Sequence, residues 1–355
     1  MIRLSLRQFR IQAGVALGLL LIVAVLLIST RPHLAHLYDL YAKAQTACAA
    51  SDNCRQVNVN LGRVDQLLEL IGTALVALPA LIGAFWGAPL ISRELETGTH
   101  RLAWTQSVSR THWLRAKLAV VGLASVATTG LLSLLVTWWS SPIDRAHLNR
   151  FGAGVFGERN IAPLGYAAFG FVLGVTAGVL IRRTLPAMAT TLGVFLGVRL
   201  AFSYLVRPHL MSPRHLTTSL AEVTQGFGST NGGPPTLFAG PPNLPNAWVY
   251  STRILDADGH GLTSQAALSA CPNLALPLPE TVPGSGHAVP TQAPADARQA
   301  FQTCVTKLSS TYHGLVTYQP ANRYWIFQSY ETAIFLAAAA VLGWLCFYLI
   351  RRRAT

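Results

Sequence analysis

Residues 92–117 read SRELETGTHRLAWTQSVSRTHWLRAK and lie between two long apolar stretches of the chain. They carry Glu94 and Glu96 together with five Arg or Lys residues, whereas the flanking stretches carry almost no charge. Each of these charges would cost several kcal/mol inside hydrocarbon, so the segment must lie outside the membrane core. An excess of Arg and Lys in a short loop is typical of the cytoplasmic side. We therefore expect a cytoplasmic loop between two spans, with Gly98 breaking it into two short helical pieces.

The composition of the chain is that of a membrane protein. Hydrophobic residues make up 51% and charged residues 12% of the 355 residues, and the mean hydropathy is +0.39. Such values predict an all-α membrane protein instead of a soluble domain. Six apolar stretches are long enough to cross a bilayer. They cover residues 11–28, 67–91, 118–139, 164–181, 185–206 and 329–350.

The distribution of charge predicts the orientation of these spans. Segments 1–12, 92–117, 182–183 and 351–353 hold 13 Arg or Lys residues and two acidic residues. Residues 207–328 hold six basic and five acidic residues. This alternation is the pattern of cytoplasmic and outer loops, and it predicts six transmembrane helices with both ends in the cytoplasm. It also explains the net charge of +13 without nucleic acid as a partner.

The same reasoning divides the chain into three parts. Residues 1–206 contain the first five spans and the cytoplasmic element 92–117. Residues 207–328 are rich in Pro, Gly, Ser and Thr and follow an outward-going span, so we expect an extracytoplasmic domain between the fifth and sixth spans. Residues 329–355 contain the last span and a basic cytoplasmic tail.

Four cysteines fall on the outer side, where an oxidising compartment permits disulfides. We expect the pairs Cys48–Cys54 and Cys271–Cys304, the second of which would cross-link the outer domain. A metal pair is the competing interpretation of the first, but no second pair of ligands lies nearby in the sequence. Residues 256–261, DADGHG, begin like a calcium loop, yet the twelfth position is Ala267 instead of Glu. We therefore predict no metal site.

Polar residues inside the spans are the next candidates. Arg199 lies well within the fifth span, and an intramembrane Arg is a candidate functional residue whose partner should be sought. We expect a structural ion pair with Glu331, near the outer end of the last span, and a contact with the substrate is the competing interpretation. A hydroxyl stripe in the third span could line a transport path, although such side chains more often bond to their own or a neighbouring helix. It consists of Ser125, Thr129, Ser133 and Thr137.

Glycines in the fourth span form a double GxxxG pattern at Gly170, Gly174 and Gly178, which lets another helix approach closely. Pro79 is expected to kink the second span, because proline removes a backbone donor. No GxxxxGK[ST], GxSxG or HExxH motif occurs in the chain. The sequence therefore contains no P-loop for ATP and no recognisable catalytic set.

The pattern Arg-Glu-x-Glu-x-Gly-Thr at residues 93–99, followed by Ser-Arg and by Lys117, is similar to that of permease subunits of ABC-2-type exporters. The C-terminal stretch YQPANRYW…YETAIFLAAAAVLGWLCFYLIRRR at residues 318–353 resembles theirs as well, with actinobacterial multidrug and antibiotic exporters the most similar. The resemblance covers the spans and their flanks and is weak between residues 207 and 317.

The resemblance implies a coupling helix that seats in a groove of a cytoplasmic ABC ATPase, which would bind ATP and Mg²⁺ while this chain holds no cofactor. It implies further a bacterial plasma-membrane protein that pairs with a second permease copy or a paralogue and moves a drug, peptide or lipid outward. The turn at Arg182 and Arg183 is a second candidate contact. The coupling residues expected from the motif are Arg93, Glu94, Glu96, Thr97, Gly98, Thr99 and Arg101.

Two alternatives remain at this point. The charged loop could be a topology signal with no docking role, as any multi-pass protein needs one. The chain could also be a non-transporting membrane sensor whose outer domain binds a ligand, and it would then purify without an ATPase. An enzyme of the outer domain is disfavoured by the missing catalytic set.

Overall fold

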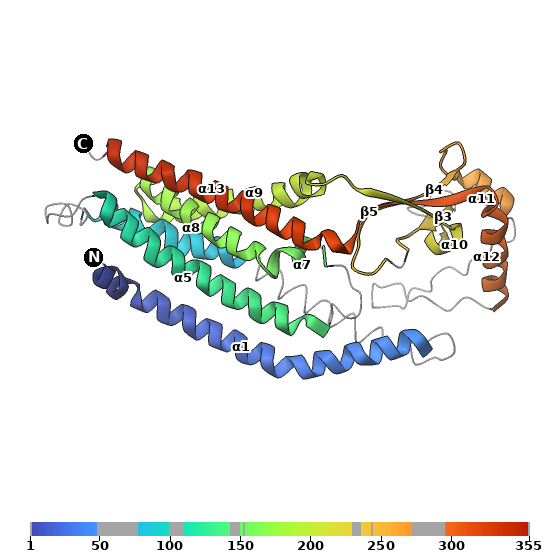
Figure 1. The fold of residues 1–355 in the computed structure, drawn as a ribbon, viewed down its shortest axis with the longest axis horizontal. Helices are drawn as coiled ribbons and strands as arrows, with labels where there is room; N and C mark the ends of the chain where they lie inside the picture. The colour runs from blue at the N-terminus through green and yellow to red at the C-terminus, as the bar shows by residue number, and fades with distance from the viewer. Residues whose placement is uncertain are drawn as a thin grey trace, which may run out of the picture. The chain divides into compact units, whose positions relative to one another are not determined.

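The computed structural model describes residues 2–47, 77–98, 110–142, 150–151, 153–228, 236–242, 244–271 and 295–353 (Figure 1). The chain forms two compact units. The first comprises Met1–Met211 and Asn322–Thr355, and the second comprises Ser212–Ala321. The sequence placed these boundaries at 207 and 328. Residues 207–211 and 322–328 belong to the first compact unit.

The described residues of the first unit form helices joined by turns and contain no strand. Residues 77–82 are helical and lead directly into η1, a π-helical turn. The elements are α1 (Ile2–Ala47), η1 (Gly83–Gly87), α3 (Ala88–Glu96), α5 (Arg110–Trp139), α7 (Ala153–Glu158), α8 (Ala162–Ile181), α9 (Thr184–Ala201), η2 (Phe202–Val206), η3 (Arg207–His209) and α13 (Tyr324–Arg353). A short 3-10 helix, η4 (Ala321–Arg323), precedes α13.

Within the described residues, five helices are long and apolar enough to cross a membrane. They are Ala13–His36, Thr111–Trp139, Ala162–Ile181, Thr184–His209 and Ala321–Arg352. Each overlaps one of the predicted spans. The remaining predicted span, 67–91, is described only from residue 77, so the total of six and their orientation stay predictions.

Helix α8 is the centre of the first unit and contacts α13, α3, η1, α5 and α9. Its three glycines let the helix of residues 77–96 approach so closely that no side chain fits between them. A Cβ atom at Gly170 would lie 2.6 Å from the carbonyl oxygen of Pro79, and one at Gly178 would lie 2.6 Å from that of Ala88. The double GxxxG is therefore a helix-packing surface within this chain.

The second unit contains strands, so the prediction of an all-α protein is wrong for this part of the chain. A three-stranded antiparallel sheet has the order β1 (Arg214–Thr218), β5 (Tyr312–Gln319), β4 (Trp248–Asp256). A second sheet pairs β2 (Thr224–Gly228) with β3 (Thr236–Ala239). Aromatic and β-branched residues are frequent in β4 and β5 and favour the pleated conformation. The Pro- and Gly-rich segments obscured this signal.

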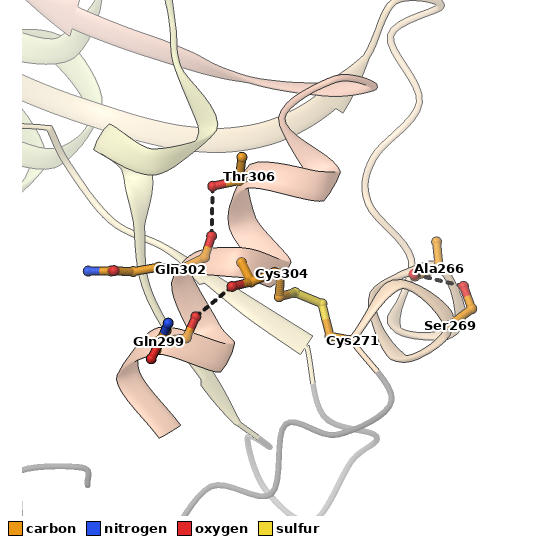
Figure 2. The surroundings of a disulfide bond; sticks show 8 residues. Ala266, Ser269, Cys271, Gln299, Gln302, Cys304 and Thr306 are labelled. Carbon is orange, nitrogen blue, oxygen red and sulfur yellow. Dashed lines mark hydrogen bonds between the residues drawn. A yellow bond between two sulfur atoms is a disulfide. The ribbon is translucent and has the colours of Figure 1, made fainter. Parts of the chain in front are cut away.

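The described residues of the second unit also form three helices, α10 (Leu220–Val223), α11 (Ser264–Ala270) and α12 (Ala295–Leu308). Leu220, Val223, Ile254, Val305 and Val316 belong to its own apolar core. Cys271, just after α11, forms a disulfide with Cys304 of α12 beside this core (Figure 2). The bond closes a loop with a sequence separation of 33 residues, which limits the freedom of the unfolded chain. Cys48 and Cys54 lie outside the described residues.

Candidate functional site

The end of α3 holds the predicted coupling residues that the structure describes. The Thr97 amide and hydroxyl both donate to the carbonyl oxygen of Arg93, at 3.1 and 2.9 Å. Gly98 follows with φ of +72°, a conformation that suits glycine after the last turn of a helix. Thr99 and Arg101 lie outside the described residues.

Glu94 connects α3 to α5. Its carboxylate forms an ion pair with the ammonium group of Lys117, which is only 4% exposed. The Lys117 Nζ also lies 4.7 Å from the ring centroid of Trp113. Burying the Lys117 ammonium without its carboxylate partner would cost free energy. The ion pair therefore stabilises the observed position of α5 relative to α3.

Glu96 connects α3 to α9. Its Oε2 accepts hydrogen bonds from the Thr184 hydroxyl at 2.7 Å and from the Thr184 amide at 3.1 Å. Thr184 begins α9, so the carboxylate satisfies an amide at the helix N-terminus, where negative charge is favourable. The Thr184 hydroxyl, followed by the Thr184 amide, holds the pKa of Glu96 below its usual range.

The turn between α8 and α9 lies beside the end of α3 as a result. Arg182 adopts the left-handed conformation with φ of +57°, and its amide donates to the carbonyl oxygen of Gly178 at 3.1 Å. The Ser92 hydroxyl lies 3.3 Å from that of Thr184. The described part of the predicted coupling segment, residues 92–98, and the predicted contact at Arg182 and Arg183 thus lie together. We call residues 92–98 and 182–184 the α3–α9 corner. Its exposed basic side chains are Arg93, Arg182 and Arg183.

A buried charge cluster lies between α8, the end of α9 and α13. Glu331 of α13 is completely buried and accepts hydrogen bonds from Arg207 Nε at 2.8 Å and Nη2 at 2.9 Å. Arg199 Nη1 lies 3.3 Å from the same carboxylate, and the Tyr166 hydroxyl donates to it. The structure therefore places the predicted partners Arg199 and Glu331 together, with Arg207 in the more intimate contact.

Arg199 is held by several weaker contacts. Its Nη1 donates to the Ser203 hydroxyl at 2.6 Å, and its guanidinium lies 4.1 Å from the Tyr166 ring centroid. Its Nε has no hydrogen-bond partner among the described residues. Gly157 of α7 packs directly against the guanidinium, leaving no room there for a Cβ atom.

Sequence reasoning missed Arg207, although a signal was present. Arg199, Ser203 and Arg207 follow one another at intervals of four residues, which places them on one helical face. The span was predicted to end at Val206, so Arg207 was assigned to the outer domain. The π-helical turn η2 and the 3-10 turn η3 continue the helix to His209 and bring Arg207 to Glu331.

Glu158 borders this cluster at the end of α7 and is 9% exposed. Burial raises the pKa of the Glu158 carboxyl to about 7, although the charges of Arg159 and Arg199 act in the opposite direction. This carboxyl changes its charge near neutral pH, a property that the sequence did not indicate.

The hydroxyl stripe of α5 faces protein. Ser125 donates to the carbonyl oxygen of Val121 at 2.8 Å, and Thr137 donates to that of Ser133 at 2.7 Å. Ser133 donates to the carbonyl oxygen of Asn160 at 2.8 Å, and the Thr129 hydroxyl has no partner in the described part of the chain. Path lining by this stripe stays a prediction that would require α5 to separate from its neighbours.

The segment that resembles the start of a calcium loop folds as a turn. Asp256 Oδ1 accepts the amides of His260 at 2.8 Å and Asp258 at 3.0 Å, and the His260 amide is the largest cause of the lowered pKa of Asp256. Ligand atoms of these three residues lie within 4.8 Å of one another, and Oδ1 of Asp256 already accepts two amides of the turn. The absence of a metal site here stays a prediction.

The family model described as ABC-2 membrane transporter related matches residues 17–207. Neither the curated proteins nor the solved structures contain a match. The matched residues run from α1 to Arg207 and include the α3–α9 corner and both arginines of the charge cluster.

Proposed function

We propose, since the chain belongs to the ABC-2 membrane transporter related family, that it is the permease subunit of an ATP-driven exporter. The family and the apolar helices make the chain a multi-pass membrane transport component that is not itself catalytic. The finer parts of the proposal are outward transport of a hydrophobic or amphipathic drug, peptide or lipid, and location in a bacterial plasma membrane. A second permease copy or paralogue would complete the path, and ATP and Mg²⁺ would bind to the ATPase.

The α3–α9 corner is the observation that carries the coupling proposal. Three exposed arginines lie on it, whereas Glu94 and Glu96 have partners within the chain. We infer that Arg93, Arg182 and Arg183 contact acidic groups of the ATPase. The carboxylates of Glu94 and Glu96 instead connect α3 to its neighbouring helices. Motion imposed on α3 would then reach α5 through Glu94 and α9 through Glu96, as a rigid lever between closed and open states requires.

The docking role is tested by copurification. The double variant Arg182→Glu/Arg183→Glu of the full chain should no longer copurify with the ATPase in detergent. In liposomes, substrate should no longer stimulate ATP hydrolysis by the ATPase. Arg351→Glu/Arg352→Glu is the matched control, because it reverses two exposed arginines at the end of α13 and should preserve both activities. Copurification unchanged by the first pair would contradict the docking role. A chain that never binds an ATPase would favour the sensor function.

The connection of α3 to α5 through Glu94 is tested by exchanging the charges of Glu94 and Lys117. Glu94→Lys alone should uncouple ATP hydrolysis from transport, because it puts two ammonium groups together. Glu94→Lys/Lys117→Glu restores an ion pair of reversed polarity and should recover most transport. An exchange variant as inactive as Glu94→Lys would instead assign Glu94 to direct contact with the ATPase.

A further inference from the structure

An apolar cavity lies between α1, the helical residues 77–87 and α5. Its volume is about 450 Å³, within the range of roughly 300–1,000 Å³ found for ligand pockets. Among the described residues that line it, none is charged, and Thr128 of α5 contributes the only hydroxyl. The chemistry of the wall therefore selects against ions and strongly polar molecules.

The packing of α1 explains why the cavity forms. The C-terminal half of the α1 span is fixed to α5 by a cluster that includes Leu27, Leu34 and Trp139. The Trp139 indole also donates to the Thr30 hydroxyl at 3.0 Å, and the Arg31 guanidinium lies 4.3 Å from the Trp138 ring centroid. In the N-terminal half of the α1 span, side chains between Val15 and Val23 line the cavity instead of packing against α5.

The π-helical turn η1 shapes the opposite wall. Gly83 and Gly87 face the glycine surface of α8 so closely that neither could carry a Cβ atom. Phe85 and Trp86, between them, line the cavity. A π-helical turn adds a residue to the helix and is frequent at functional sites. One side of the π-helical turn η1 thus packs against α8, and the other side forms part of the cavity wall.

The cavity is elongated and open on one side. Its lining on α1 runs from Val15 to Val23, which corresponds to about 12 Å along the helix axis. Val15 and Leu19 are each 58% exposed at the rim, whereas Ile82 and Leu132 are 5% and 8% exposed at the back. An occupant that enters from the rim would lie parallel to the helices.

We propose that this cavity binds the hydrocarbon chain of a lipid-like molecule. Water would find few hydrogen-bonding partners on such a wall, and apolar cavities of protein interiors bind apolar molecules readily. A flexible hydrocarbon chain matches the length, the apolar wall and the entry from the membrane side. Binding is separate from the transport proposal, because it requires neither the ATPase nor ATP.

Photolabelling of the full chain tests the site. The probe is hexadecanol carrying a diazirine, added to nanodiscs of phosphatidylcholine, with adducts mapped by peptide mass spectrometry. Saturable adducts on Ile82 and Leu132 are expected, because these side chains are reached through the cavity. Leu17 and Leu21 are 63% and 58% exposed and report nonspecific labelling from the bilayer.

Ala16→Trp fills the cavity from α1 and should lower labelling of Ile82 by about tenfold, equivalent to about 1.4 kcal/mol of binding. Thr128→Trp fills it from α5 and should do the same, so the test does not depend on one variant. Leu17→Trp is the matched control on an exposed face of α1 and should leave labelling of Ile82 unchanged. Adducts confined to Leu17 and Leu21, or Ile82 labelling that both filling variants leave intact, would overturn the proposal.

A second labelling experiment identifies the molecule to which the bound hydrocarbon chain belongs. It uses phosphatidylcholine with the diazirine in its acyl chain as the only probe. Labelling of Ile82 by this phospholipid would identify a bilayer lipid as the occupant. Labelling by the alcohol alone would identify a single-chain molecule, the class from which a transported substrate could come.

Discussion

At the scale of single residues, Glu331 is the group on which the buried charges depend. It is completely buried and is the nearest carboxylate to both Arg199 and Arg207. Glu331→Gln would leave two buried guanidinium groups without their counter-charge, at a cost of about 3–5 kcal/mol. We expect a large fall in the melting temperature of the purified chain in detergent.

The two arginines should differ in the same assay. Arg207 makes two hydrogen bonds to Glu331 below 3 Å, whereas Arg199 makes one at 3.3 Å and has an unpartnered Nε among the described residues. Arg207→Met should therefore lower the melting temperature more than Arg199→Met. Equal losses for the two variants would contradict the assignment of Arg207 as the main partner.

Glu158 predicts a pH dependence. Because its pKa is raised from 4.5 to about 7, the folded chain holds this proton more tightly than the unfolded chain between those values. Stability must then fall as the pH rises through that window. Glu158→Gln should raise the melting temperature at pH 8, by the equivalent of about 1–3 kcal/mol, and leave it nearly unchanged at pH 5.

The control for that measurement is Asp258→Asn, which removes an exposed carboxylate and should show no such difference. A stabilisation by Glu158→Gln that is the same at both pH values would show that the effect comes from packing. In that case the carboxyl would not titrate in the range expected from its burial.

The sequence indicated part of the charge cluster. An Arg within an apolar span must have a partner, so Arg199 directed attention to Glu331. It gave no hint of Tyr166, whose hydroxyl looks ordinary in an apolar helix, or of Gly157, whose importance comes from the guanidinium packed against it. Such contacts depend on which helices are neighbours, and hydropathy does not contain that information.

At the scale of helices, the glycine surface of α8 is the main packing device. A side chain at Gly174 would meet the carbonyl oxygen of Gly83 and lie 2.8 Å from the amide nitrogen of Ala88. Gly174→Leu should separate α8 from α3, costing at least about 1–3 kcal/mol. The loss is measured as lower melting temperature and lower yield of monodisperse protein.

Gly193→Leu on α9 is the matched control, because a Cβ atom there meets nothing within 4 Å. It should be tolerated by the isolated chain. If Gly174→Leu were tolerated equally well, the close approach of α3 and α8 would have to be wrong.

The membrane-spanning helices could be predicted from the sequence, because length and apolar composition alone determine where they lie. Long apolar runs located all five described spans, because the membrane demands both length and hydrophobicity. The predicted ends differ from the observed ones by up to eight residues, since a helix can continue past the apolar run. The π-helical turns η1 and η2 were not predictable, since they follow from packing against α8 and α13. The strands of the second unit were missed because short strands between loops give a weak periodic signal.

At the scale of the whole molecule, the two units differ in what stabilises them. The first unit is held by close helix packing and a buried ion cluster. The second unit has a small core beside a disulfide, as expected for a small domain with few core-forming residues. Interpreting the chain as a transporter therefore rests on the first unit, to which the family match is confined.

The orientation of the spans is the last prediction. Helix α1 begins and α13 ends at the same end of the first unit (Figure 1), where the charge pattern predicts the cytoplasm. In sequence, only α9 and its continuation to His209 separate Arg183 from the second unit. We predict that this helix crosses the membrane once and places Arg183 and Asp258 on opposite sides. In a Cys48→Ala/Cys54→Ala background, Asp258→Cys should react with an impermeant maleimide on intact spheroplasts. Arg183→Cys should react only after permeabilisation, because Arg residues are retained on the cytoplasmic side. Labelling of Arg183→Cys from outside would reverse the topology, and labelling of both positions from one side would show that α9 does not span.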